Sequence, residues 1–339
     1  GKEGRPRKQS RQKEKGECGG QDAHRPQRDA VPHALQVAGR KEEKERKRQE
    51  DDRGTERGQS TGFHTKIYER EGQNMSKKLG IALGAGGARG VAHVGFLHAL
   101  EEADIRTDCV TGCSMGAIVG ACYCAGVPME QLHDVALSLK LSRIAAFNVN
   151  PIRSSGLMRH NKAHKLMEEI LGGDIQFSDL RTPFSCVATD LISGKTVELK
   201  EGSVIDAALA SSTVPGAFSP AEMDGMFLVD GGVLERVPVI ELKKMGAEVI
   251  VAVDVLGDLV SISQERPSNL IETFLRYIDV IDTRVTGSKR KSRVRTIDLW
   301  LEPELGNMDQ YKVKQLDFAY EKGYELGKAN VGKIGEHIR

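Results

Sequence analysis

From residue 78 onwards, short apolar segments alternate with longer amphipathic ones, and this alternation limits the fold more than any other feature of the sequence. Short apolar runs are typical of buried strands, whereas the longer segments have helical periodicity. The predicted order begins with a strand at 78–83, a helix at 91–103, a strand at 109–111 and a helix at 115–125. Such an order predicts a mainly parallel sheet that helices cover on both faces.

The alternation resumes in the second half of the chain, after a segment at 129–173 that is predicted to be mostly helical. Within that segment, Pro151 and Gly156 mark an irregular stretch, 148–156, as a candidate cover for a site. No internal repeat with a period of about 20 to 50 residues is found, so one folded domain at 75–339 accounts for the pattern. Further strands are predicted at 184–189, 196–199, 226–229, 249–253 and 296–301, and further helices at 204–210, 239–245, 269–285 and about 311–326.

Residues 1–74 differ from the remainder in composition. Between Lys41 and Ser60 there is no aliphatic or aromatic side chain. Such a stretch cannot bury enough apolar surface to offset the entropy lost on ordering, so residues 1–74 are predicted to form a disordered N-terminal arm. The arm holds 19 Lys and Arg against 14 Asp and Glu, a net charge of +5; since the whole chain carries +1, residues 75–339 carry −4.

The charged run at 41–52 is a candidate arm for binding nucleic acid or a membrane. Its acidic and basic residues are mixed, however, which weakens the electrostatic field they produce. We therefore expect no nucleic-acid partner and interpret the segment as a solvated spacer or as non-native sequence. Met75 stands directly before the first apolar strand, and we interpret it as the natural start of the protein.

Compartment and metal content are inferred from features that the sequence lacks. The charged N-terminus has no apolar segment behind it, so no secretory signal peptide is predicted. No window approaches the ~20 apolar residues of a transmembrane helix. Five of the six cysteines fall in apolar strands or helices, and Cys122 and Cys124 have no companions at zinc-site spacing. We expect a reducing, cytoplasmic location and no metal.

The segment Gly112-Cys113-Ser114-Met115-Gly116 matches the G-x-S-x-G pattern at a predicted strand-to-helix turn. Its two glycines permit a sharp turn that presents the serine hydroxyl, and the N-terminus of the following helix offers free N–H groups for a developing oxyanion. Ser114 is therefore a candidate nucleophile. The alternative is that Ser114 serves only as the N-cap of that helix.

A second glycine-rich turn, Gly84-Ala85-Gly86-Gly87-Ala88-Arg89-Gly90, separates the first strand from the first helix. Its bare backbone N–H groups suit an oxyanion hole or a phosphate cradle. The alternative is a dinucleotide-binding loop. Against it, Arg89 stands where the third glycine of G-x-G-x-x-G belongs, and Asp108 precedes a strand instead of ending one. We therefore favour the oxyanion hole.

A carboxylate follows a third strand, in the segment Asp230-Gly231-Gly232. A carboxylate at the carboxyl end of a strand lies where open α/β sheets build their sites. The alternative is an ordinary Asp-Gly turn. Together with the first two segments, Asp230 completes the groups that acyl transfer needs, because Ser114 can attack a carbonyl, Asp230 can accept its proton and the amides near 86–88 can stabilise the oxyanion.

A histidine base is not required by this set. His93 lies three residues beyond Gly90 on a predicted helix, where it faces either the site or the sheet. A lone helical histidine is more often a core or surface residue than a catalytic one, so we expect a Ser–Asp dyad. The other histidines outside the arm are not beside a glycine-rich strand end: His98, His133, His160, His164 and His337.

These segments, in this order, resemble the patatin-like phospholipase family, and within it the small bacterial members related to the catalytic domain of neuropathy target esterase. The likeness extends to Val91-Ala92-His93-Val94-Gly95 and to the run S-S-T-V-P-G-A-F-S-P at 211–220, and it spans about 78–301. The resemblance implies a three-layer α/β/α fold with a mainly parallel central sheet. It also implies a Ser–Asp dyad and the hydrolysis of acyl esters, often of phospholipids or lysophospholipids, without a cofactor.

Carried over residue by residue, the resemblance assigns the nucleophile to Ser114 and the base to Asp230. The sequence departs from the family at Ala85, where a glycine is usual. If Ala85 had to adopt a positive φ, the loop would be strained unless the strain shifted to Gly84. The resemblance assigns the oxyanion loop to Gly86, Gly87, Ala88 and Arg89, and the turn glycines of the motifs are Gly84, Gly90, Gly112, Gly116, Gly231 and Gly232.

Substrate and partners follow from the resemblance only in outline. We expect a lipid or small ester substrate, and two segments are candidates for peripheral membrane contact, the basic run at 289–295 and the apolar stretch at 139–147. Their alternatives are a solvated helix end and a piece of core. A non-catalytic lipid-binding module and an acyltransferase with an acceptor other than water are the alternative functions, and the sequence does not define the oligomeric state.

Overall fold

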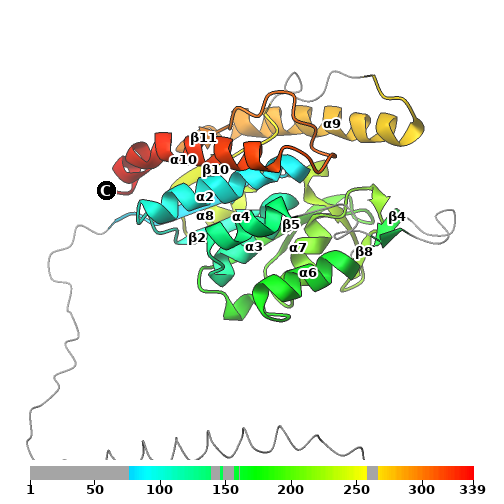
Figure 1. The fold of residues 1–339 in the computed structure, drawn as a ribbon, viewed down its shortest axis with the longest axis horizontal. Coiled ribbons are helices and arrows are strands. Elements are labelled where there is room, and N and C mark those ends of the chain that lie inside the picture. Colours follow the sequence, from blue (N-terminus) through cyan, green and yellow to red (C-terminus); the bar gives the residue numbers. More distant parts are fainter. Residues whose placement is uncertain (1–75, 139–145, 148–155, 160, 258–265) are drawn as a thin grey trace, which may run out of the picture. The chain divides into compact units, whose positions relative to one another are not determined.

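The computed structural model describes residues 76–138, 146–147, 156–159, 161–257 and 266–339 (Figure 1). All of these residues lie in one compact unit, Gly72–Arg339. The predicted arm at 1–74, Met75, and nearly all of the irregular stretch and of the apolar stretch before it lie outside the described residues. Their predicted roles stay predictions.

Within the described residues, the main sheet has eight strands in the order β11-β10-β1-β2-β5-β9-β8, with β6 also paired to β5. The first five strands in this order are parallel. β6 and β9 run antiparallel to β5, and β8 runs antiparallel to β9. The mainly parallel sheet predicted from the alternation is therefore confirmed. The strand bounds are β1 Leu79–Leu83, β2 Cys109–Gly112, β5 Phe184–Asp190, β6 Lys195–Leu199, β8 Ala221–Met223, β9 Met226–Asp230, β10 Val249–Val253 and β11 Leu299–Leu301.

Helices cover both faces of the sheet, which makes three layers. Helices α2, α3, α7 and α10 pack on one face around the larger core, and α8 packs on the other face around a smaller core. Figure 1 shows α2 and α10 side by side. The helix bounds are α2 Ala92–Glu102, α3 Met115–Ala125, α4 Met129–Leu137, α6 Asn161–Leu171, α7 Val204–Ser211, α8 Val239–Lys244, α9 Leu270–Ser292 and α10 Leu316–Ile338, with short 3₁₀ turns η1 Gly87–Val91, η2 Phe177–Asp179 and η3 Gly231–Val233.

The structure corrects the predicted elements in several regions, and β7 (Gly216–Phe218) and β8 lie where no element was predicted. Besides α4 and α6, the segment at 129–173 contains β3 (Ala146–Phe147) and β4 (Gly156–Arg159), because β4 pairs with the distant β7 in a small second sheet. The last two helices are also displaced from their predictions. α9 continues beyond 285 to Ser292, and α10 begins after Gln315, which adopts a left-handed conformation.

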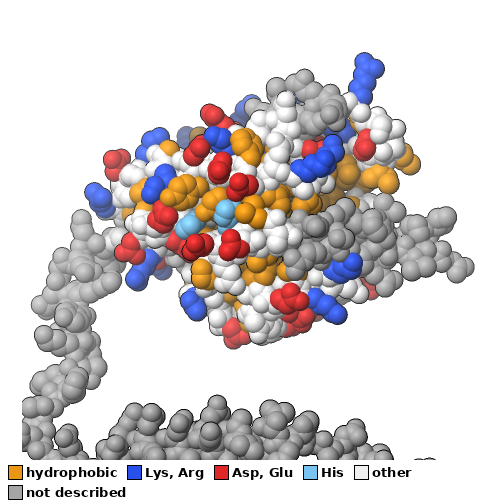
Figure 2. All heavy atoms as spheres, in the orientation of Figure 1, with side chains coloured by type: hydrophobic (Ala, Val, Ile, Leu, Met, Phe, Trp, Pro, Cys, Tyr) orange, Lys and Arg blue, Asp and Glu red, His pale blue; other side chains and the backbone are white. Residues whose placement is uncertain are grey.

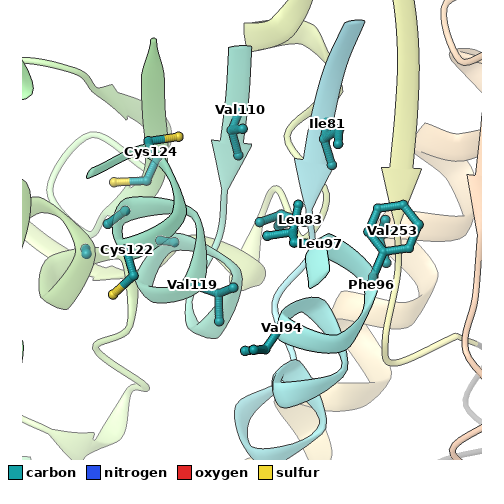
Figure 3. Close-up of a cluster of buried hydrophobic side chains, with 14 of the residues drawn as sticks. Ile81, Leu83, Val94, Phe96, Leu97, Val110, Val119, Cys122, Cys124 and Val253 are labelled. Carbon is teal, nitrogen blue, oxygen red and sulfur yellow. The ribbon is translucent and has the colours of Figure 1, made fainter. Parts of the chain in front are cut away.

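The central strand β1 shows how side chains divide between the two cores. Leu79, Ile81 and Leu83 belong to the larger core, whereas Ala82 belongs to the smaller one. Figure 3 shows the larger core, in which side chains from β1, β2 and β10 lie against those of α2 and α3. Every residue of β1 is buried, as expected for a central parallel strand that is covered on both faces.

The register of the sheet brings the three glycine-rich turns to one edge. Leu83 at the end of β1 pairs with Gly112 at the end of β2, so the turns that follow these strands are neighbours. Asp230 pairs with Ala188, which lies two residues beyond Cys186, the partner of Gly112 on β5. Because β5 extends past the end of β2, the antiparallel β9 ends level with the residues that follow β2.

Candidate active site

Ser114 occupies the turn between β2 and α3 in an uncommon backbone conformation, with φ 54° and ψ −123°. A positive φ at a residue with a side chain costs on the order of 1–3 kcal/mol, and the surrounding structure must impose it. The two flanking glycines make this packing feasible, because a Cβ at Gly112 would lie 2.5 Å from Cα of Ala117 and one at Gly116 would lie 2.3 Å from the carbonyl oxygen of Leu83. The strand–turn–helix geometry predicted from the motif is therefore observed.

The side chain of Ser114 contacts Asp230. The serine stands at the N-cap position of α3, but its hydroxyl makes no capping hydrogen bond. Instead Oγ donates to Oδ2 of Asp230 over 2.5 Å. The other carboxylate oxygen, Oδ1, accepts from the backbone N–H of Gly232 at 2.8 Å and lies 3.8 Å from Sγ of Cys113. Asp230 is thus held by its own turn and presents one oxygen to Ser114.

The surroundings of Asp230 raise the pKa of its carboxyl group. Burial raises the pKa of Asp230 to about 6, although the hydrogen bond from Ser114 favours the charged form. An oxygen acid with such a pKa is ionised at neutral pH, yet is a stronger base than an exposed aspartate. The carboxylate is therefore suited to accept a proton from a neighbouring hydroxyl.

Two of the four amides assigned to the oxyanion loop already have backbone partners. The N–H of Ala88 donates to the carbonyl oxygen of Gln310 at 2.9 Å, and the N–H of Arg89 donates to that of Gly86 at 3.0 Å. Within the described part of the chain, no hydrogen bond occupies the N–H groups of Gly86 and Gly87, nor that of Met115, which follows the serine. The available donors are therefore Gly86 and Gly87, together with Met115, which the sequence analysis did not single out.

The side chain of Arg89 anchors the loop through backbone carbonyl groups. The guanidinium is buried, and its Nε donates to the carbonyl oxygen of Val255 at 2.7 Å. Nη1 lies 3.3 Å from the carbonyl oxygens of Gly306 and Met308. Burial lowers the pKa of Arg89 to about 10. This residue ties the amide loop to the turns after β10 and β11.

The substitution of glycine by Ala85 does not strain the loop. Ala85 is not among the residues with positive φ, and neither is Gly84, to which the strain was expected to shift. Gly87 instead adopts φ 50°, and a Cβ there would lie 2.3 Å from the carbonyl oxygen of Gln310. The loop position that carries the positive φ is therefore Gly87.

The family model described as patatin-like phospholipase matches residues 81–243, which contain both glycine-rich turns and Asp230. Residues 81–243 belong to the patatin-like phospholipase family. An uncharacterized NTE family protein of Mycobacterium tuberculosis is 33% identical over 202 residues, which cover 60% of this chain and 56% of that protein. The lysophospholipase nte1 of Emericella nidulans is 28% identical over 288 residues, 76% of this chain and 18% of that protein. The chain therefore spans just over half the length of the mycobacterial relative.

The patatin-like fold is also found among solved structures. VipD from Legionella pneumophila superimposes with a TM-score of 0.54 at 12% identity, over 76% of this chain and 67% of that one. At this identity the likeness concerns the fold alone. The expected patatin-like α/β architecture is thus confirmed.

The patatin-like domain has an open pocket of about 520 Å³ above Ser114 and Asp230, part of it open to solvent. Sequence reasoning assigned no role to the rest of its wall. Val214 and Pro215 come from the run at 211–220 that carried the resemblance, and most of the other lining side chains come from α9 and from loops without a motif. Apart from the glycine-rich turns, the pocket is lined by Val214, Pro215, Val233, Leu256, Ile278, Asp279, Asp282, Gln310 and Tyr311.

A buried serine supports the turn at 112–116 of the patatin-like domain, which we call the serine elbow. Oγ of Ser211 accepts from the backbone N–H of Ser114 at 2.9 Å and donates to the carbonyl oxygen of Val187 at 2.7 Å. Ser211 opens the run at 211–220 that carried the resemblance, although no role was assigned to it. Its hydroxyl links the elbow to the end of α7 and to β5.

A buried ion-pair network attaches α9 to the sheet beside the pocket. Arg236 donates through Nη2 to Asp254 at 2.7 Å and through Nη1 to Asp282 at 2.9 Å. Burial raises the pKa of Asp282 to about 6, despite its contact with Arg236. The carbonyl oxygen of Arg236 also accepts from the N–H of Ala85 at 3.0 Å, so the network holds the amide loop as well.

His93 takes no part in the contact between Ser114 and Asp230. Its Nε2 lies 2.8 Å from the carbonyl oxygen of Gly84, and the ring is fully buried. Burial lowers the pKa of His93 to about 4. Among the described residues, no histidine is hydrogen-bonded to Ser114 or to Asp230. His93 faces the first turn of the site and supports its backbone.

None of the described helices combines the length and the apolar character that a membrane crossing requires.

Proposed function

We propose that the protein is a serine acyl hydrolase that cleaves carboxylic esters of lipids through Ser114 and Asp230. The observation that carries the proposal is the 2.5 Å hydrogen bond between the strained serine and a buried aspartate. A serine that served only to cap α3 would not need a positive φ or a carboxylate partner. Membership of the patatin-like phospholipase family and a relative named lysophospholipase support a lipid ester as substrate.

Acylation would begin when Oγ of Ser114 attacks the ester carbonyl carbon and its proton passes to Oδ2 of Asp230. The carbonyl oxygen becomes an oxyanion, which the free N–H groups of Gly86, Gly87 and Met115 would stabilise. When the intermediate collapses, the bond to the alcohol breaks and the alcohol leaves with the proton from Asp230. Ser114 is then esterified by the acyl group.

Deacylation would repeat these steps with water. Asp230 accepts a proton from the attacking water, the acyl-oxygen bond to Ser114 breaks, and the proton returns to the serine. The products are a carboxylic acid and the free enzyme. Because Asp230 acts in both halves of the cycle, its replacement should block acylation and deacylation alike.

The pocket wall suits a substrate with an apolar part. Val214, Pro215 and Val233 line it together with Leu256 and Ile278. Such side chains bind an acyl chain by removing its surface from water, at about 25 cal/mol per Å². We therefore choose two test substrates. The first is a lysophospholipid, and the second is a short-chain p-nitrophenyl ester, which is soluble in water.

The experiment is covalent labelling with a fluorophosphonate probe, combined with turnover of the p-nitrophenyl ester. We expect the wild type to be labelled on Ser114, and Ser114→Ala to lose both labelling and turnover by about a thousandfold or more. The matched control is Ser178→Ala, an exposed serine that also has a carboxylate neighbour, Asp179, 3.5 Å away. It should be labelled and active like the wild type.

The same experiment separates the alternative functions. A lipid-binding module would bind lysophospholipid without forming a fluorophosphonate adduct, and that result would overturn the proposal. An acyltransferase would be labelled but would pass its acyl group to an alcohol acceptor faster than to water, which product analysis by mass spectrometry detects.

A further inference from the structure

Helix α9 has its polarity reversed with respect to the usual surface helix. Its three buried side chains are all polar: Asp279, Asp282 and Thr286. Surface helices normally bury an apolar stripe and expose a polar one. Of the large hydrophobic side chains that are exposed in the described residues, more lie on α9 than on all other elements together: Leu270, Ile271, Phe274, Tyr277, Val280 and Ile281.

Polar contacts hold the inner face of α9 on the domain. Oδ1 of Asp279 accepts from Nε2 of Gln310 at 2.9 Å and from the hydroxyl of Tyr311 at 2.6 Å. Asp282 pairs with Arg236. Nearer the C-terminal end, Nζ of Lys289 pairs with Glu235 at 2.5 Å. The helix is thus anchored by charged and hydrogen-bonding groups. Its large apolar side chains remain exposed and are available to contact a surface outside the domain.

The outward residues form a continuous stripe. Leu270, Phe274, Tyr277 and Ile281 are spaced four, three and four residues apart, which places them along one face of a helix. They are exposed by 84%, 43%, 61% and 36% respectively. We call these four residues the α9 stripe. A contiguous exposed apolar surface of this kind marks an interaction site.

The α9 stripe adjoins the mouth of the pocket. The ring of Phe274 lies over Gly216, 3.2 Å from where a Cβ of that glycine would be. Pro215, the preceding residue, lines the pocket, and so does Ile278, which is one residue beyond Tyr277. An apolar chain could therefore pass from the stripe to Ser114 along an apolar path.

The same outward face becomes basic towards the C-terminal end of α9. Arg284 and Lys291 are three and ten residues beyond Ile281, at helical spacings that continue the stripe, and both are exposed. The helix begins at the right-hand end of the molecule in Figure 1, and hydrophobic side chains are visible at that end in Figure 2. A helix with apolar residues on one part and cations on the rest of an exposed face is suited to the interface of an anionic bilayer.

We propose that the α9 stripe docks on the surface of an anionic phospholipid bilayer, with Arg284 and Lys291 against its headgroups. The proposal rests on the proposed function, since it names the surface from which that site would draw its lipid substrate. The apolar stripe would enter the interface, and a lipid acyl chain would pass Phe274 into the pocket. Exposed basic residues beside the stripe distinguish this occupant from an uncharged apolar partner.

The test is co-sedimentation with vesicles of phosphatidylcholine and phosphatidylserine in equal amounts, using the full chain with Ser114→Ala so that the lipid is not hydrolysed. We expect the added pair of changes Leu270→Gln and Tyr277→Gln to weaken vesicle binding at least about tenfold, which corresponds to about 1.4 kcal/mol. The matched control is Leu137→Gln, on an apolar side chain of α4 that is 46% exposed. It should bind like its parent.

A second pair of changes tests the basic part of the face. Arg284→Glu with Lys291→Glu should weaken binding to the phosphatidylserine vesicles and leave the weaker binding to phosphatidylcholine vesicles unchanged. If either pair of changes binds anionic vesicles as well as its parent, the docking proposal is wrong. It is equally wrong if light scattering shows that Leu270→Gln with Tyr277→Gln turns an oligomer into a monomer, because the stripe would then bind a second copy of the chain.

Turnover of the soluble p-nitrophenyl ester distinguishes this failure from failure of the proposed function. Leu270 and Tyr277 do not line the pocket, so with Ser114 intact their replacement should leave soluble turnover unchanged. Stripe-dependent vesicle binding without any esterase activity would contradict the proposed function alone. Esterase activity without stripe-dependent binding would contradict the docking surface alone.

Discussion

Oγ of Ser114 donates a 2.5 Å hydrogen bond to Oδ2 of Asp230, across two strands that are not neighbours in the sheet. β5 lies between β2 and β9, and the contact forms above its buried surface, where Asp230 pairs with Ala188. Burial raises the pKa of the carboxyl to about 6. Under the proposed function, we expect this contact to govern activity, its pH dependence and the stability of the fold around it.

Asp230→Asn should lower ester turnover by about a thousandfold or more while making the protein more stable at pH 7. The amide cannot accept the proton of Ser114, but it carries no charge to bury. The difference between an ordinary pKa of 3.8 and about 6 corresponds to about 3 kcal/mol of unfavourable free energy in the ionised folded state. The free energy of unfolding of both proteins, measured with denaturant at pH 7 and at pH 4, tests this prediction.

The stability gain of Asp230→Asn has a definite pH dependence. Because the folded pKa is raised, ionisation weakens the folded state as the pH rises from about 4 to about 6. The gain should therefore be near zero at pH 4 and reach its full value above pH 6. An equal gain at both pH values would mean that packing, and not charge, is responsible.

The turnover of the soluble ester should follow the ionisation of Asp230. Below about pH 6 the carboxyl is protonated and cannot act as a base, so kcat/KM should fall tenfold for each pH unit. His93, whose pKa burial lowers to about 4, should leave no inflection of its own. Stopped-flow or plate kinetics between pH 4.5 and pH 8 tests this, and an activity that stays constant down to pH 5 would contradict the assignment of Asp230 as base.

Gly87→Ala should abolish turnover through the amide loop. The alanine would have to keep the positive φ of Gly87, and its Cβ would lie 2.3 Å from the carbonyl oxygen of Gln310. The loop would therefore have to move away from the oxyanion position. Gly172→Ala is the matched control, because it also has a positive φ but no atom within 4 Å of its Cβ. It should lose about 1 kcal/mol of stability and keep its kcat. Similar kinetics for the two variants would show that the loop tolerates the shift.

Arg236→Met should destabilise the domain by about 3–5 kcal/mol at pH 7.5, because Asp254 and Asp282 would remain buried without their cation. Part of this loss should return at pH 5, where the carboxyl of Asp282 with its raised pKa is protonated. Arg290→Met is the control. Its ion pair with Glu302 is half-exposed, so its loss should stay within about 1 kcal/mol in the same unfolding experiment.

Iodoacetamide should leave the native enzyme active in a chain that carries Cys18→Ser. All five remaining cysteines are buried and form no disulfide. Burial and the charge of Asp230 raise the pKa of Cys113 well above its usual value, so little reactive thiolate is present at pH 7.5. Residual esterase activity and intact mass after treatment measure this. Rapid inactivation together with alkylation of Cys113 would show that the site opens to reagents.

Local features of the site were predictable because they depend on residues that are adjacent in the chain. Gly112 and Gly116 permit the turn that holds Ser114 at a positive φ, and this requirement can be recognised from five residues. The alternation of apolar runs likewise predicted the parallel strands β1, β2 and β5. Both signals reflect short-range steric and burial rules.

The position of Asp230 was predicted for an incomplete reason. The prediction assumed that Asp230 follows a strand parallel to its neighbours, so that its carboxyl end lies at the same edge of the sheet. β9 instead runs antiparallel to β5, and Asp230 reaches the site only because β5 extends beyond β2. Similarly, the sequence does not show that Gln310 occupies the amide of Ala88. Strand register and pairing of distant polar groups are set by contacts between remote segments.

By itself, then, the sequence determined the layered α/β architecture, the serine elbow and the glycine-rich turns, since each follows from neighbouring residues and the conformations they allow. Only the tertiary structure decided which amides stay free, that Gly87 and not Ala85 carries the positive φ, and that α9 turns its polar face inward. The physical reason is that a polar group meets its partner only when distant segments come together. Asp282 on α9 can be buried because it forms an ion pair with Arg236, which lies beside the sheet.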